Sequence, residues 1–171
     1  MKERLILLFL ITIIGCGKHT TTSNSVEEYF DPQKIRQLSI ETDAFWQGEE
    51  ITSISDFVTG NFNDHPDFLA GKRYSSENKV IGISVFNNKE SAINAMEGRR
   101  NTVACVILLG ESNDLIKSKW WYSDCIPNGI FINQKNTIIE LGYYYPDYSE
   151  IEDFLMQSAA FLADKVESLS E

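Results

Sequence analysis

Two runs of β-forming residues, with a helical pattern between them, limit most strongly what this chain can fold into. Residues 79–86 predict one strand and residues 102–109 predict a second, because both runs are dense in branched apolar side chains. Asn88 can cap a helix that continues through Arg100 between them. The second run is almost continuously apolar, which predicts burial on both faces of a sheet. The sequence therefore predicts a β-α-β unit here.

A hairpin and a long helix are predicted after this unit. Residues 130–133 and 137–144 alternate as paired strands do, around a turn at residues 134–136. Ser149 and Glu152 have the spacing of a capping box, and the helix that follows reaches about Leu169. Its apolar positions form one stripe, made by Ile151, Phe154, Leu155, Phe161, Leu162, Val166 and Leu169.

The pattern before the β-α-β unit is weaker. Residues 27–38 are expected to be helical, with Asp31 as the N-cap and Pro32 at the first helical position. Residues 44–46 (Ala-Phe-Trp) predict a short strand, and residues 51–69 contain mainly turn signals.

This order of elements predicts an α+β fold. We expect a single domain with a mixed, largely antiparallel sheet and two or three helices packed mainly on one face. The chain shows no internal repeat and no second linker, so residues 26–171 are assigned to one globular domain. An aromatic content of 12% is enough to build a core, which argues against intrinsic disorder.

The first fifteen residues have the character of an export signal rather than of a folded element. Lys2 and Arg4 make a basic start, and residues 5–14 are apolar apart from Thr12. Ten helical residues span roughly 15 Å, half the hydrocarbon core of a bilayer, so a permanent membrane span is the weaker interpretation. We therefore predict a signal peptide at residues 1–15.

The signal ends in Ile13-Ile14-Gly15-Cys16, which resembles the lipobox of bacterial lipoproteins. In that family the small residue fits the signal peptidase, and the Cys becomes an acylated N-terminus. The resemblance implies that Cys16 carries a diacylglyceryl group and a further fatty acid such as palmitate. Several acyl chains give stable membrane anchoring, which one chain would not. The alternative is an ordinary signal peptide with a chance Cys.

Residues 16–25 would then be the lipidated Cys and a flexible, polar tether. Gly17 follows the Cys where inner-membrane lipoproteins of Gram-negative cells often carry Asp. The resemblance therefore implies an exported, membrane-anchored protein of the cell envelope, at the outer membrane if the source is Gram-negative, with its domain at the cell surface or in the periplasm.

The charge balance further limits the classes of partner that the protein can bind. The chain carries 15 Lys and Arg against 25 Asp and Glu, a formal net charge of −10. Removing the signal, whose Lys2, Glu3 and Arg4 sum to +1, leaves −11 on the exported part. Nucleic-acid binding needs clustered positive charge, so we expect no nucleic-acid partner. No phosphate loop or dinucleotide motif is present, and we expect no cofactor.

Cys105 and Cys125 are the thiols that remain once Cys16 is assigned to lipid. Export places them in an oxidising compartment, where an even number of Cys favours a disulfide. The alternatives are a buried thiol at Cys105 and a reactive one at Cys125. Nucleophilic catalysis by Cys needs a nearby stabilising group such as His65, the domain's one His.

Asp64, His65 and Asp67 gather two carboxylates and an imidazole in four residues. Such a loop is a weak candidate for a divalent cation. The same residues, together with Pro66, are also ordinary turn formers. No second His completes a zinc set in the domain, and our assignment is no metal site.

Two groups of aromatic residues form a candidate binding patch. They are Trp120, Trp121 and Tyr122 before Cys125, and Tyr143, Tyr144 and Tyr145 at the end of the hairpin. Neighbours on a strand point to opposite faces, so part of each group is expected to face away from the core. The alternative is that they belong to the core and a covered sheet edge.

Residues 80–169 are loosely similar in pattern to the exported, sensor-type lipoprotein domains found outside mycobacterial sensor kinases. That resemblance implies ligand sensing or envelope association. No catalytic constellation assembles from the sequence, so the preferred hypothesis is a non-enzymatic, lipid-anchored envelope protein that binds a protein partner or small ligand. The alternatives are a small envelope hydrolase with an Asp/Glu pair and a structural accessory subunit of an envelope complex.

Overall fold

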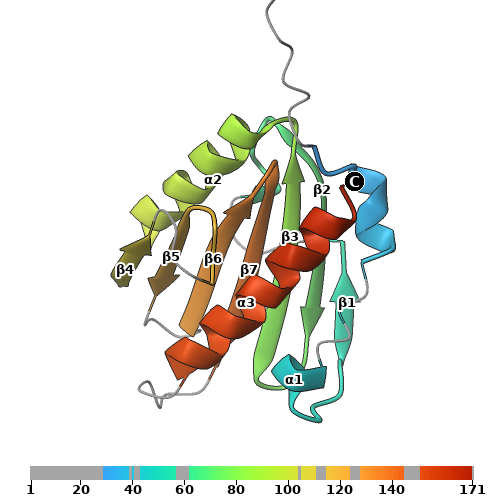
Figure 1. Ribbon diagram of the computed structural model, residues 1–171, viewed down its shortest axis with the longest axis vertical. Coiled ribbons are helices and arrows are strands. Elements are labelled where there is room, and N and C mark those ends of the chain that lie inside the picture. The colour runs from blue at the N-terminus through green and yellow to red at the C-terminus, as the bar shows by residue number, and fades with distance from the viewer. Residues whose placement is uncertain are drawn as a thin grey trace, which may run out of the picture.

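One antiparallel sheet organises the described part of the chain (Figure 1). The computed structural model describes residues 29–38, 40, 43–56, 62–103, 105–110, 115–123, 128–144 and 151–170. Within these residues, no helix has the length and apolar character needed to cross a membrane.

The sheet has seven strands in the order β1-β2-β3-β7-β6-β5-β4. Their bounds are β1 Ser53–Ser55, β2 Phe68–Ser75, β3 Lys79–Phe86, β4 Val106–Gly110, β5 Trp120–Ser123, β6 Asn128–Gln134 and β7 Thr137–Tyr143. Each neighbouring pair of these strands is antiparallel. The predicted α+β class, with a largely antiparallel sheet, is therefore confirmed.

The strand β3 has the predicted bounds and lies near the middle of the sheet. All of its residues are buried. Ile81 and Ile83 belong to the core on one face, whereas Phe86 belongs to the core on the other. The strand therefore supplies both cores, which explains its nearly unbroken apolar sequence.

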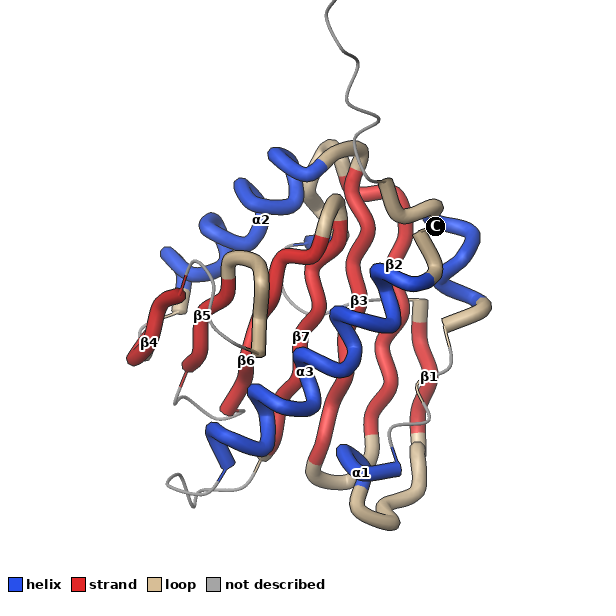
Figure 2. Tube along the Cα trace, viewed as in Figure 1, coloured by secondary structure: helices blue, strands red, loops and turns tan. Residues whose placement is uncertain are grey.

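Helix α3 (Ile151–Ser168) crosses one face of the sheet diagonally (Figure 2). The short helices η1 (Pro32–Arg36) and α1 (Asp43–Trp46) supply buried residues to the same core. Leu155, Leu162 and Val166 are fully buried, as the predicted stripe required. Phe161 is exposed, so its place in that stripe was wrong; small residues such as Ala159 occupy the contact instead.

Helix α2 (Lys89–Thr102) lies on the opposite face. The Asn88 side chain accepts a hydrogen bond from the Ser91 amide at 2.8 Å, which confirms the predicted cap. Its inner side packs against Phe86, Trp121 and Phe131. Most helical elements therefore share the α3 face, and α2 alone among the described helices covers the other.

The β-α-β unit exists, but its strands are not neighbours. Strands β7, β6 and β5 lie between β3 and β4 in the sheet. Helix α2 extends to Thr102, so β4 begins at Val106 rather than at residue 102. The predicted two-face burial of this run was wrong at Leu109, which is exposed because β4 forms the edge of the sheet.

The predicted strand at residues 44–46 is also wrong, because these residues belong to helix α1. One helical turn brings the adjacent rings of Phe45 and Trp46 into the same core, which a strand would send to opposite faces. Positive φ angles at Gln47 and Gly48 follow the helix. Within the helical prediction for residues 27–38, the described helix is η1, with Asp31 accepting from the Gln33 amide at 2.9 Å as predicted.

The predicted hairpin is confirmed as β6 and β7, and its turn has a second role. The Asn136 side chain accepts from the Phe30 amide at 2.7 Å and donates to the Phe30 carbonyl at 3.2 Å. It also donates to the Phe86 carbonyl at 2.7 Å. Asn136 therefore fixes the segment entering the domain to the end of the central strand β3. Ser149 of the predicted capping box lies outside the described residues.

Candidate functional site

The first aromatic group does not form an exposed patch. Trp121 and Tyr122 are buried in the cores on opposite faces of the sheet. Trp120 is half-buried, and its ring lies so close to Gly110 that an added Cβ there would come within 2.1 Å of it. The prediction of a surface patch was therefore wrong for Trp121 and Tyr122, because the cores under α2 and α3 cover the two faces of β5.

The second aromatic group lies two strands away from the first. Tyr122 is level with Leu141 of β7 through their common neighbour Ile130, and Leu141 lies two residues before Tyr143. Tyr143 is half-buried beside Lys79, and the exposed Tyr144 accepts a hydrogen bond from Arg73 at 3.1 Å. Tyr145 lies outside the described residues. The structure does not bring the described aromatic candidates together.

Hydrogen bonds within the loop and to residues around the start of α2 fix the loop that contains Asp64, His65 and Asp67. The Asp67 carboxylate accepts from Ser91 at 2.7 Å and from Asn87 at 3.0 Å, and these bonds lower its pKa. The Asp67 amide donates to His65 Nδ1 at 3.2 Å. Among the described residues, no group of three or more His, Cys, Asp and Glu side chains could hold a metal ion. The loop joins the entry of β2 to the first turn of α2.

Cys105 lies directly before β4 and is half-buried. Its carbonyl accepts a hydrogen bond from the Ser123 hydroxyl at 2.7 Å, and Val106 pairs with Ser123 across the sheet. Cys125 comes two residues after Ser123 and, like Cys16, lies outside the described residues. The Cys105–Cys125 bridge stays a prediction that this register supports.

Lys79 is a buried cation that the sequence did not single out. Its ammonium donates to the Trp46 carbonyl at 2.9 Å and to the Gln47 side chain at 3.0 Å, and pairs with Glu49 at 3.2 Å. The rings of Phe45, Tyr143 and Phe154 lie 5.4–5.9 Å from it. All three ammonium donors therefore have partners, and this cluster joins α1, β3, β7 and α3 rather than offering a site.

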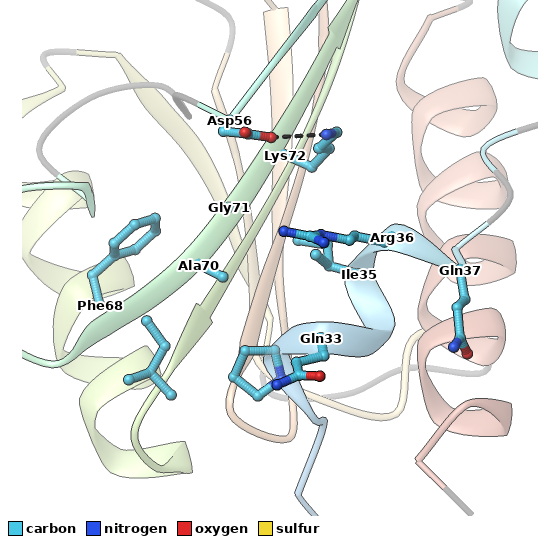
Figure 3. Close-up of a pocket in the computed structure, with 11 residues that line it drawn as sticks. Gln33, Ile35, Arg36, Gln37, Asp56, Phe68, Ala70, Gly71 and Lys72 are labelled. Atoms are coloured by element: carbon cyan, nitrogen blue, oxygen red, sulfur yellow. Dashed lines mark hydrogen bonds and ion pairs between the residues drawn. The ribbon is translucent and has the colours of Figure 1, made fainter.

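A groove between η1 and β2 is the best candidate for a binding site (Figure 3). It has a volume of about 980 Å³, within the range of small-molecule sites. One wall is the η1 segment, and the other is residues 68–72 of β2, with Asp56 beyond the end of β1. The groove exists because η1 packs onto β2 above the part of that strand that β1 does not reach.

One end of the groove is charged. Lys72 donates to Asp56 at 2.8 Å, and Figure 3 shows Arg36 reaching from η1 toward β2 beside this pair. The hydrogen bond from Lys72 lowers the pKa of Asp56, and the charges of Lys72 and Arg36 lower it further. The carboxyl group is therefore an anion that is paired with Lys72 and further favoured by the charge of Arg36.

The remainder of the groove is mostly apolar. Ile35 of η1 is buried beneath it, and Phe68, Leu69 and Ala70 line β2 in the direction away from Lys72. Gln33 contributes an amide from the exposed side of η1. The groove thus runs from a charged end to an apolar one.

Sequence patterns did not predict this groove. Its two walls lie more than thirty residues apart in the chain. Taken alone, the η1 wall has the sequence pattern of a short polar helix, and the β2 wall has that of a weak strand. Lys72 and Arg73 are adjacent charged residues, so this part of β2 lacks the alternation of apolar and polar residues that would have predicted a strand. No family model matches the chain, and no curated protein or solved structure matches it either.

Proposed function

We propose that this chain is a non-enzymatic, lipid-anchored protein of the cell envelope whose domain binds a small ligand in the groove between η1 and β2. The observation that carries the proposal is the groove itself, whose lining combines apolar and small residues with the polar or charged side chains of Gln33, Arg36, Gln37, Asp56 and Lys72. In small-molecule sites, polar groups orient a ligand that apolar contacts hold.

The charged groups of the groove favour binding over hydrolysis. Glycoside hydrolysis needs two carboxylates about 5–10 Å apart across the scissile bond. Asp56 is the one carboxylate in the lining, and it is paired with Lys72. The described groove therefore supplies a recognition group and lacks the pair that the hydrolase alternative requires.

The membrane part of the proposal rests on the sequence. Cys16 would carry the lipid after signal removal, and residues 17–25 would be the tether of the domain. The exported protein would then lie at the envelope, at the outer membrane in a Gram-negative cell. Cys16→Ala should release the processed protein from the membrane fraction, as measured by fractionation and intact mass. Retention of the processed Cys16→Ala protein would contradict lipid anchoring.

Ligand binding can be tested with a pair of matched substitutions. Ala70→Trp fills the groove, whereas Ala44→Trp places the same side chain on the exposed side of α1. Protein purified from the native envelope is denatured, and the released small molecules are identified by mass spectrometry. We expect Ala70→Trp alone to lose a compound that the wild type and Ala44→Trp retain. Identical compounds in all three proteins would contradict the proposal.

An exported domain would also form the Cys105–Cys125 bridge. Closing a loop of about 20 residues stabilises by roughly 3 kcal/mol in the chain-entropy model. Alkylation of the native exported protein before and after reduction, followed by intact mass, should show both thiols protected until the reductant is added. Two alkylated thiols without reductant would contradict the bridge.

A further inference from the structure

We propose that the ligand of the groove is an aliphatic monocarboxylate, a molecule with one carboxylate and an unbranched apolar tail. The inference rests on the proposed function and adds the chemical class of the ligand. Three features of the groove carry it: the sign of its charge, the replaceable partner of Lys72, and the length of its apolar part.

The groove is locally positive in a strongly negative chain. Arg36 and Lys72 against Asp56 give the lining a net charge of +1, whereas the whole chain has a formal charge of −10. A ligand with a single negative charge would neutralise this lining. A cationic ligand would instead meet two like charges in the same place.

The second feature is the unequal exposure of the ion pair. The Lys72 side chain is 25% exposed, whereas that of Asp56 is 85% exposed. Lys72 is thus held by its strand, and Asp56 reaches it from solvent. A ligand carboxylate can take the place of Asp56 at the ammonium group at little cost, because solvent-exposed ion pairs contribute little to stability. Arg36 extends from η1 toward β2 near the same pair (Figure 3).

The third feature is the distribution of polarity along β2. From Lys72 to Leu69 the strand advances three residues, or about 10 Å at the usual rise. Over that distance the lining changes from the charged end to Ala70 and Leu69 of β2, with Ile35 on η1, whereas the ring of Phe68 packs against Phe86 in the core on the other face of the sheet. The length suits the tail of a medium-chain fatty acid. A tail without hydrogen-bonding groups also suits this stretch, where apolar side chains predominate.

The proposal is tested by titrating the folded domain with three probes that share one tail. Octanoate is anionic, octanol is neutral, and octyltrimethylammonium is cationic; each is used below its micelle concentration. The backbone amides of Ala70 and Gly71 report occupancy by NMR. Salt near 0.15 M limits the influence of distant charges, because screening acts over about 8 Å. We expect octanoate to bind most tightly and the cation most weakly.

Charge variants assign the selectivity to the proposed groups. Lys72→Gln and Arg36→Gln should each weaken octanoate binding about tenfold and leave octanol binding unchanged, since a charge-assisted hydrogen bond is lost. Asp56→Asn should strengthen octanoate binding severalfold by removing the competing carboxylate. Lys89→Gln removes an exposed positive charge at the start of α2 and should have no effect.

The outcomes separate this proposal from the broader one. Equal binding of octanoate and octanol at Ala70 and Gly71 would show a ligand groove without anion selectivity, and would overturn only the ligand class. Absence of binding by all three probes would also overturn the proposed ligand class. The co-purification experiment then determines whether the groove binds any small molecule. If an apolar pentapeptide with a free carboxyl terminus binds more tightly than octanoate, the occupant is a peptide. That result would also overturn the proposed ligand class.

Discussion

Two lysines on adjacent strands each bind a carboxylate, with opposite consequences. Lys79 of β3 is 1% exposed, and its ammonium has three partners and three neighbouring rings. Lys72 of β2 has the same kind of ion pair at the open end of a groove, with an exposed partner. The first lysine is part of the fold and the second is available for recognition. Burial and the number of partners, rather than residue type, distinguish the two roles.

The largest effect that this comparison predicts is on stability. Lys79→Ala should reduce the free energy of unfolding by about 2–5 kcal/mol, because it leaves space among aromatic rings and removes the buried donor to the Trp46 carbonyl and the Gln47 side chain. Urea unfolding followed by circular dichroism measures the change. Lys72→Ala is the matched control and should cost less than about 1 kcal/mol. Equal losses in the two variants would remove the distinction between the two lysines.

A smaller effect on stability is expected from Glu49, the carboxylate that pairs with Lys79. Burial would raise the pKa of Glu49, but hydrogen bonds from Ser76, Lys79 and the Asn78 amide, together with the charge of Lys79, outweigh it and lower the pKa below its ordinary value of 4.5. The carboxylate therefore stabilises the fold above about pH 4.5, and this contribution is lost as the pH falls through the lowered value.

Glu49→Gln should accordingly cost about 1–2 kcal/mol at neutral pH. The difference between the wild type and the variant should shrink as the pH is lowered below about 4.5. Urea unfolding across a pH series gives both quantities. A difference that stays constant down to pH 3 would contradict the assignment of this acid sensitivity to Glu49.

The smallest effect on stability is expected at the groove. Lys72→Gln should change the free energy of unfolding by no more than about 0.5 kcal/mol, because its ion pair is open to solvent. The same variant should weaken octanoate binding about tenfold, as described above. Thermal unfolding and the NMR titration of one protein preparation compare the two effects directly. A large stability loss would assign Lys72 to the fold and weaken the case for the groove.

Strong local patterns predicted the central elements correctly. The strand at residues 79–86, the Asn88 cap and the β6–β7 hairpin each follow from residues close in sequence, so propensity and tertiary packing agree. Helix α1 was missed because it has only four residues, Asp43–Trp46, whose conformation the surrounding core decides through Phe45 and Trp46. The exposure of Leu109 depends on strand order, which local sequence does not contain.

The candidate site could not be predicted from local sequence patterns for the same reason. The predicted aromatic patch was inferred from aromatic clusters and strand alternation, and the burial of Trp121 and Tyr122 shows that alternation does not report whether helices cover both faces of the sheet. The groove depends on residues of η1 meeting β2, and on Arg36 reaching the pair formed by Lys72 and Asp56. None of these contacts is local in the sequence.

The hydrogen bonds of Asn136 have a mechanical consequence. They join the backbone of Phe30, where the chain enters the domain, to the carbonyl of Phe86 at the end of β3. A pull on the chain at Phe30 would therefore load the middle of the sheet first, where β3 is paired on both sides, instead of peeling away the edge strands β1 or β4. The domain should resist tension applied at this point as one unit.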